Sequence, residues 1–169
     1  DDLIKGKPTT PPGKDKKKDE PVVDEVATGI LGGAVAGEKY AIDVGICDYP
    51  GSVNDICVSD GDAQNMNNAL INIYGYNSEN IILLRDMNAT YNNILSAVDE
   101  VRASVTVDDE VVFFFSGHGT TARVNDGDRE KIDEGLVTHN GTNMQYIWDG
   151  QLKMWFSDFS TSRIAFVFD

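Results

Sequence analysis

The chain has 169 residues, of which 41% are hydrophobic and 25% charged, as expected for one globular domain. Its formal net charge is −14, from 14 basic and 28 acidic side chains. The first 20 residues hold six of the basic and five of the acidic side chains, so the acidic excess lies after residue 20. Such an acidic surface repels nucleic acid phosphates, which excludes DNA and RNA as partners. No apolar run approaches the roughly 18 residues of a membrane span.

Residues 1–38 are expected to form a flexible N-terminal tail and linker. Prolines at 8, 11, 12 and 21 prevent a long helix, and three lysines at 16–18 stand among polar residues that have little to bury. We therefore expect the folded domain to cover residues 39–169.

From Lys39 onward the apolar pattern predicts alternating strands and helices. Strands are expected over residues 39–46, 80–85, 110–116 and 163–168, and helices over residues 60–74, after the cap Thr90, and over 149–156. The segment 117–143 is predicted to be a polar loop. The third strand is apolar without a break, which is typical of a strand buried on both faces. This order predicts an α/β fold, a mostly parallel sheet sandwiched by helices.

The sequence Ser116-Gly117-His118-Gly119 directly follows the third predicted strand. Functional residues of parallel sheets gather outside the carboxyl ends of the strands, so His118 is expected to face a crevice there. The flanking glycines would let a peptide backbone approach, and an imidazole can act as base and acid near neutral pH. A histidine held only by local hydrogen bonds is the alternative, and we adopt it for His139.

The segment 113–120, Phe-Phe-Phe-Ser-Gly-His-Gly-Thr, resembles the histidine motif of the caspase and metacaspase peptidases. Segment 166–169 resembles the strand that this family continues as Asp-x-Cys-x-Ser-Gly. Segments 39–46, 62–70 and 86–90 resemble the family's first strand, first helix and second helix start. The resemblance covers residues 39–169 in family order, and it implies a caspase-like (caspase-haemoglobinase) fold of which this chain carries the large-subunit portion.

The resemblance implies a Cys-His dyad. His118 would activate a cysteine and protonate the leaving amine, and the backbone around Gly119 would help to hold the oxyanion. Neither Cys47 nor Cys57 stands in the nucleophile's place, and both are expected to be buried thiols. The nucleophile is therefore expected in a C-terminal part beyond Asp169.

The resemblance also implies a substrate specificity. Asp62 and Asp169 match the two acids with which metacaspases hold arginine or lysine at P1, and Asp60 and Ser116 are further candidates for this S1 pocket. The expected partners are therefore protein or peptide substrates with basic residues. Capping of the first helix is the alternative role for Asp60 and Asp62.

Five acids crowd nine residues after the histidine motif: Asp126, Asp128, Glu130, Asp133 and Glu134. Lys131 replaces the turn glycine of an EF-hand and Val137 its bidentate glutamate, so an EF-hand is excluded. Asp133 and Asp149 match calcium ligands of metacaspases, although Gly150 replaces the second acid usual after Asp149. No cofactor is expected to be required; calcium is expected only as an activator, and a solvated acidic loop is the alternative.

The function expected is a cysteine endopeptidase that cleaves after arginine or lysine, with calcium stimulation and self-processing. Two other classes stay open. A catalytically inactive pseudoprotease or interaction module would lack cysteine two positions after Asp169, and a calcium-binding regulatory domain would show heat of binding in calorimetry.

Overall fold

The computed structural model describes residues 35–169 except Cys57 and residues 124–131. Residues 1–34 of the expected tail therefore lie outside the described residues, as do Cys57 and the acids at 126, 128 and 130.

Four parallel strands form the central sheet in the order β2-β1-β3-β7. Their bounds are Lys39–Gly45 for β1, Ile81–Arg85 for β2, Glu110–Ser116 for β3 and Ile164–Phe168 for β7. The chain moves outward from β1 to β2 and then returns across β1 to β3. The winding therefore reverses between β1 and β3, which is where open α/β sheets bind their ligands.

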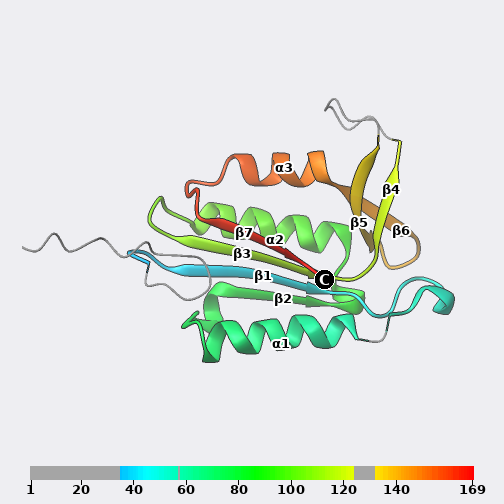
Figure 1. Cartoon of the computed structure of the whole chain (residues 1–169), viewed down its shortest axis with the longest axis horizontal. Helices are drawn as coiled ribbons and strands as arrows, with labels where there is room; N and C mark the ends of the chain where they lie inside the picture. Colours follow the sequence, from blue (N-terminus) through cyan, green and yellow to red (C-terminus); the bar gives the residue numbers. More distant parts are fainter. Residues whose placement is uncertain (1–34, 57, 124–131) are drawn as a thin grey trace, which may run out of the picture.

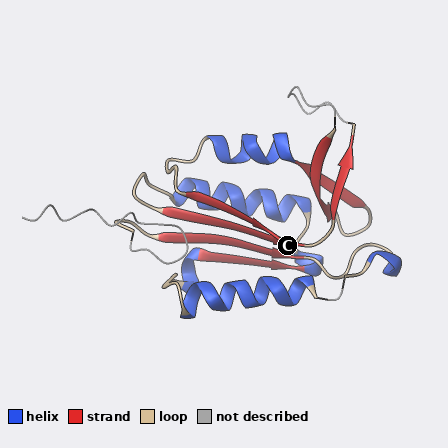
Figure 2. Ribbon diagram, viewed as in Figure 1, coloured by secondary structure: helices blue, strands red, loops and turns tan. Residues whose placement is uncertain are grey.

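Helices cover both faces of this sheet (Figures 1 and 2). α1 (Ser59–Asn72) packs on one face, and α2 (Tyr91–Ser104) and α3 (Asp149–Ser157) lie over the other. Short 3-10 helices span Ser52–Asn54, Ser78–Asn80 and Asp86–Asn88. Thr90 caps α2 as predicted, because its Oγ1 accepts a hydrogen bond of 3.2 Å from the Asn93 N–H. The predicted α/β class, with helices on both faces of a parallel sheet, is confirmed.

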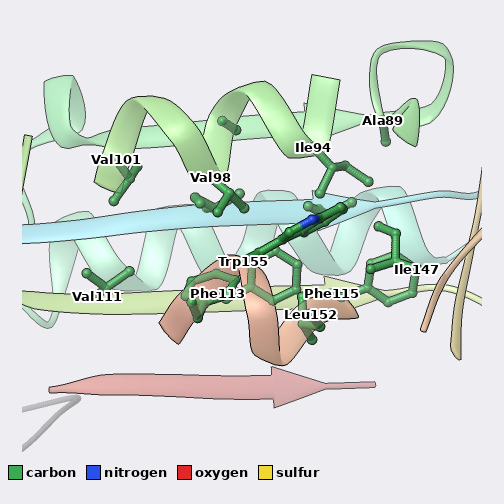
Figure 3. Close-up of a cluster of buried hydrophobic side chains, with 14 of the residues drawn as sticks. Ala89, Ile94, Val98, Val101, Val111, Phe113, Phe115, Ile147, Leu152 and Trp155 are labelled. Atoms are coloured by element: carbon green, nitrogen blue, oxygen red, sulfur yellow. The ribbon is translucent and has the colours of Figure 1, made fainter. Parts of the chain in front are cut away.

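The large hydrophobic core lies between the sheet and the α2 and α3 helices (Figure 3). Phe113 and Phe115 of β3 project into it, opposite Ile94 of α2 and Trp155 of α3. The rings of Phe113 and Phe156 meet edge to face with centroids 5.5 Å apart. The burial of these phenylalanines holds β3 in place, because truncating one core phenylalanine lowers the stability of a protein by about 3–5 kcal/mol.

The face toward α1 is different because it buries charge. Asp43 and Glu110 are fully buried there. Glu110 accepts a hydrogen bond of 2.7 Å from Tyr76 Oη and lies 3.7 Å from Lys39 Nζ. Both carboxyl oxygens of Asp43 are buried with no hydrogen-bond partner among the described residues. Burial, the largest cause, raises the pKa of Asp43 to about 7, and the Asn67 side chain acts in the opposite direction.

A second sheet replaces the polar loop predicted over residues 117–143, so that prediction was wrong. β4 (Gly119–Ala122), β5 (Asp133–His139) and β6 (Met144–Trp148) pair antiparallel in the order β4-β5-β6. A four-residue turn joins β5 to β6; within it Gly141 has φ +89°, and the Asn140 side chain accepts the N–H groups of Thr142 and Asn143. Figure 1 shows this sheet at the carboxyl end of the central strands.

β7 is an edge strand in the described part of the chain, where it pairs only with β3. Phe166 and Phe168 are 41% and 53% exposed. The fourth strand lies where it was predicted in the sequence, and it forms the open edge of the sheet in the described part of the chain. None of the helices within the described ranges has the length and apolarity to cross a membrane.

Candidate active site

His118 follows the end of β3 and is held by contacts from two other segments. Its backbone N–H donates to Tyr49 Oη over 2.9 Å, and its carbonyl accepts the Val137 N–H over 2.8 Å. Its Nε2 lies 2.8 Å from the backbone oxygen of Asn54. The ring is half-buried, and its centroid lies 5.0 Å from that of Tyr49.

These contacts determine which ring nitrogen of His118 is basic. A carbonyl oxygen only accepts hydrogen bonds, so Nε2 must carry the proton shared with Asn54. In the neutral ring the lone pair then lies on Nδ1. An imidazole held in one tautomer at the carboxyl edge of a rigid strand has what a general base requires.

Gly117 is required by a close approach of side chains. A Cβ at this position would lie 2.6 Å from Tyr49 Oη and 3.1 Å from the Phe115 ring. Gly119, by contrast, is exposed, and a Cβ there would meet only the Gly135 oxygen at 3.9 Å. Packing therefore explains the first glycine, whereas the second leaves open space beside the histidine.

Asp62, Ser116 and Asp169 come together on the α1 side of the carboxyl edge. Ser116 is buried at the end of β3, and its Oγ donates to Asp62 Oδ2 over 3.2 Å. Asp169 follows β7, where its N–H donates to the Phe115 oxygen and its own oxygen accepts the Gly117 N–H. The β3–β7 register places Asp169 beside Ser116, and strand alternation puts both on the same face.

Asp60 has a different partner. Its carboxylate forms an ion pair with Arg85 at the end of β2. The hydrogen bond from Arg85 is the main reason why the pKa of Asp60 lies below its usual value. The residue that caps α1 is Val58, so Asp60 and Asp62 lie within the first turn, where the helix dipole favours acids but neither side chain is the N-cap.

Asp133 and Asp149 lie near the same end of the small sheet. Asp133 is buried at the start of β5, and Asp149 begins α3 directly after β6. The pairing of Gly135 with Trp148 brings the two segments side by side. Asp149 Oδ1 is buried and has no hydrogen-bond partner within the described ranges. Calcium takes six to eight oxygens, and the described residues contain no cluster of three or more metal-binding side chains.

The predictions for the two cysteines and the second histidine have different outcomes. Cys47 is buried as expected, whereas Cys57 lies outside the described residues. His139 has the expected local hydrogen bond, because its Nδ1 accepts the Gly141 N–H, but its Nε2 also lies 3.0 Å from the oxygen of Asp86, 53 positions away. It was wrongly placed in a polar loop, because it ends β5 and is fully buried.

Sequence reasoning missed Tyr49, Asn54 and Asp86. Asp86 has a positive φ of 45°, and its Oδ1 accepts the N–H groups of Cys47 and Asp48. It therefore anchors the loop, residues 46–58, that carries Tyr49 and Asn54. Their position in the chain could have identified Tyr49 and Asn54, because this loop follows the carboxyl end of β1, which lies beside the end of β3.

A model of the family described as "Metacaspase, peptidase C14 domain" matches residues 39–169. Metacaspase-1 of Scheffersomyces stipitis is 35% identical over 101 residues, which are 56% of this chain and 25% of that protein. Metacaspase-1 of Saccharomyces cerevisiae strain S288c is 33% identical over 100 residues, covering 56% of this chain and 23% of that protein. The chain therefore spans about a quarter of the length of these relatives.

A solved structure supports the fold independently. Protein GSU0716 from Geobacter sulfurreducens superposes with a TM-score of 0.61 at 16% identity, covering 78% of this chain and 49% of that chain. At this identity the likeness concerns the fold alone, while the family match covers the whole of the two sheets and the histidine motif. The chain therefore belongs to the metacaspase family, as a cysteine peptidase domain of the peptidase C14 type.

Proposed function

We propose that the protein is an endopeptidase with a Cys-His dyad in which His118 Nδ1 is the base. The observation that carries this proposal is the contact between His118 Nε2 and the Asn54 oxygen, which leaves Nδ1 as the basic nitrogen. The cysteine would come from a part of the protein beyond Asp169. This chain would then supply the base, part of the oxyanion site and part of the substrate pocket.

The proposed reaction has two halves. Nδ1 takes the thiol proton, and the thiolate attacks the peptide carbonyl carbon to give a tetrahedral oxyanion, which backbone N–H groups near Gly119 help to hold. The oxyanion collapses as the C–N bond breaks, and the imidazolium gives its proton to the leaving amine. Water then attacks the thioester, with His118 taking a proton from the water and returning it to the cysteine sulfur.

The proposed substrate pocket holds arginine or lysine at P1. Asp62, Ser116 and Asp169 gather on one side of the carboxyl edge, and two carboxylates there complement a guanidinium or ammonium group. They would repel an aspartate side chain. Asp60 is left out of the proposed pocket, because Arg85 already neutralises its charge.

The experiment for this proposal is a matched set of fluorogenic peptides with arginine, lysine, aspartate or asparagine at P1, offered to the full-length protein. Cleavage after arginine and lysine supports the proposal. Cleavage only after aspartate would overturn the specificity, and no cleavage of any peptide would favour the inactive interaction module instead.

We also propose that calcium acts as an activator rather than as a required cofactor. Asp133 and Asp149 would supply two of its ligands. The observation that favours this is Asp149 Oδ1, which is buried and has no hydrogen-bond partner among the described residues. The described residues contain no group of three or more metal-binding side chains, so further calcium ligands would have to come from other groups.

A further inference from the structure

We infer that Tyr49 is a positioning residue whose hydroxyl holds the His118 backbone where the ring meets the Asn54 oxygen. This inference rests on the proposed role of His118 as the base. The hydroxyl uses both of its hydrogen-bonding capacities, since it accepts the His118 backbone N–H over 2.9 Å and donates to the Val137 oxygen over 3.1 Å. One buried hydroxyl thus joins the loop after β1, the loop after β3 and strand β5.

Tyr49 and Asn54 together hold His118, through one hydrogen bond each. Tyr49 holds the backbone of His118, and the Asn54 oxygen, five residues later in the same loop, holds the ring. The loop is closed on itself, because the Tyr49 N–H donates to Asp55 Oδ1 and the Ile56 N–H to the Cys47 oxygen. A shift of the His118 backbone would therefore change the distance between its ring and Asn54.

The Tyr49 hydroxyl is closely packed against Gly117. Tyr49 is buried, and even a single added carbon on Gly117 would overlap Oη at 2.6 Å. Burial also raises the pKa of Tyr49 to about 12, so the hydroxyl stays protonated and keeps donating to Val137 at the pH at which a histidine base works. The tyrosine ring itself packs against the imidazole at a 43° tilt.

The decisive variant is Tyr49→Phe, which keeps the ring and removes the hydroxyl. Tyr76→Phe is the matched control, because Tyr76 is also buried and donates its hydroxyl to Glu110 Oε1 on the other side of the sheet. Both variants should lose stability to a similar extent. In the full-length enzyme, kcat should fall about tenfold for Tyr49→Phe with KM changed less than about twofold, whereas Tyr76→Phe should keep both constants within about twofold.

A second readout does not depend on activity. The 169-residue chain contains only two histidines, so its imidazole ¹⁵N resonances can be assigned directly. Above the titration range, His118 of the wild-type chain should show the single Nε2–H tautomer, and Tyr49→Phe should show a mixture of tautomers. His139 is an internal reference, since both of its nitrogens are hydrogen-bonded elsewhere. Should Tyr49→Phe not fold, 3-fluorotyrosine at position 49 keeps the hydroxyl but makes it more acidic and adds one ring fluorine, and the His118 resonances should again move.

His118 resonances that are identical in the wild-type chain and the folded Tyr49 variant would overturn the inference. An equal loss of kcat in Tyr76→Phe would overturn it as well, because the effect would then be one of general stability. A full-length wild-type protein that cleaves no peptide would instead contradict the proposed function, and the NMR comparison would still decide whether Tyr49 positions His118.

Discussion

Ser116 Oγ donates a hydrogen bond to Asp62 Oδ2 over 3.2 Å, joining two residues that lie 54 positions apart. Ser116 ends β3, two residues before His118, and Asp62 lies in the first turn of α1. The bond therefore orients a carboxylate at the same sheet edge as the histidine. This relationship links the proposed base to the proposed specificity, because Ser116, which bonds to Asp62, lies two residues before His118 in the chain.

Replacing Asp62 with asparagine should raise KM for arginyl peptides by about tenfold or more, with a smaller change in kcat. The physical reason is that one remaining acid, Asp169, holds a desolvated cation less well than two. Steady-state kinetics on the matched peptides measures this. Asp60→Asn is the control, because Asp60 is paired with Arg85; an equal effect of both variants would contradict the assignment of Asp62.

Asp43→Asn should stabilise the protein at alkaline pH. The buried carboxyl has a pKa raised to about 7, so the folded state keeps its proton between about pH 4 and pH 7 while the unfolded state loses it. The free energy of unfolding should therefore fall as pH rises, by up to about 1.4 kcal/mol per pH unit in this window, and level off above it.

Urea unfolding at about pH 5 and about pH 8 measures this effect. At the higher pH the wild-type protein should be less stable than Asp43→Asn. The free energy of unfolding of the variant should lack the pH dependence that Asp43 causes. Asp99→Asn, which changes a surface ion pair with Arg102, is the control. A variant less stable than the wild type at the higher pH would mean that the Asp43 carboxylate has a partner that stabilises it.

Calcium should raise the rate of peptide cleavage, and Asp149→Asn should weaken that response. Removing one of two adjacent acids lowers the charge that attracts the cation, although it also relieves their mutual repulsion without calcium. Calorimetry and activity with and without a chelator provide the measurements. Asp158→Asn is the control, because Asp158 is an exposed acid that directly follows α3. Equal rates with calcium and with chelator, and no heat of binding, would contradict the calcium proposal.

Self-cleavage is expected within the lysine-rich stretch at residues 14–18, because an enzyme with an acidic S1 pocket accepts basic residues at P1. N-terminal sequencing of active protein should find new ends after these lysines, and the His118→Ala protein should keep its tail. Active material in which the tail is always intact would rule out this processing.

The central sheet was predictable because its strands carry strong local signals. Residues 111–115 of β3 are apolar without interruption, and every residue from Glu110 to Ser116 is buried in the structure. The position of His118 followed from that strand, since the carboxyl end of a parallel strand is a defined place in the fold. The small sheet was not predictable from apolar pattern, because β5 is rich in polar residues; the Asn140-Gly141 turn was the signal for a hairpin.

The contacts that orient His118 could not be predicted from the sequence. Tyr49 and Asn54 lie 69 and 64 positions before the histidine, and they reach it only after β1 and β3 pair. The ion pair between Asp60 and Arg85 likewise depends on the packing of α1 against β2. Residue type and spacing therefore indicated which acids could bind a cation, whereas tertiary contacts distinguish Asp60 from Asp62.

The central claim is that His118 is the base of the reaction, and the most direct measurement is kcat of the full-length His118→Ala protein on an arginyl peptide. The half-buried ring lies at a strand end, so the variant should fold, which circular dichroism verifies. The kcat of the His118→Ala protein should be lower than that of the wild type by about 10³-fold or more. A folded variant that keeps more than about a tenth of the wild-type kcat would contradict the central claim.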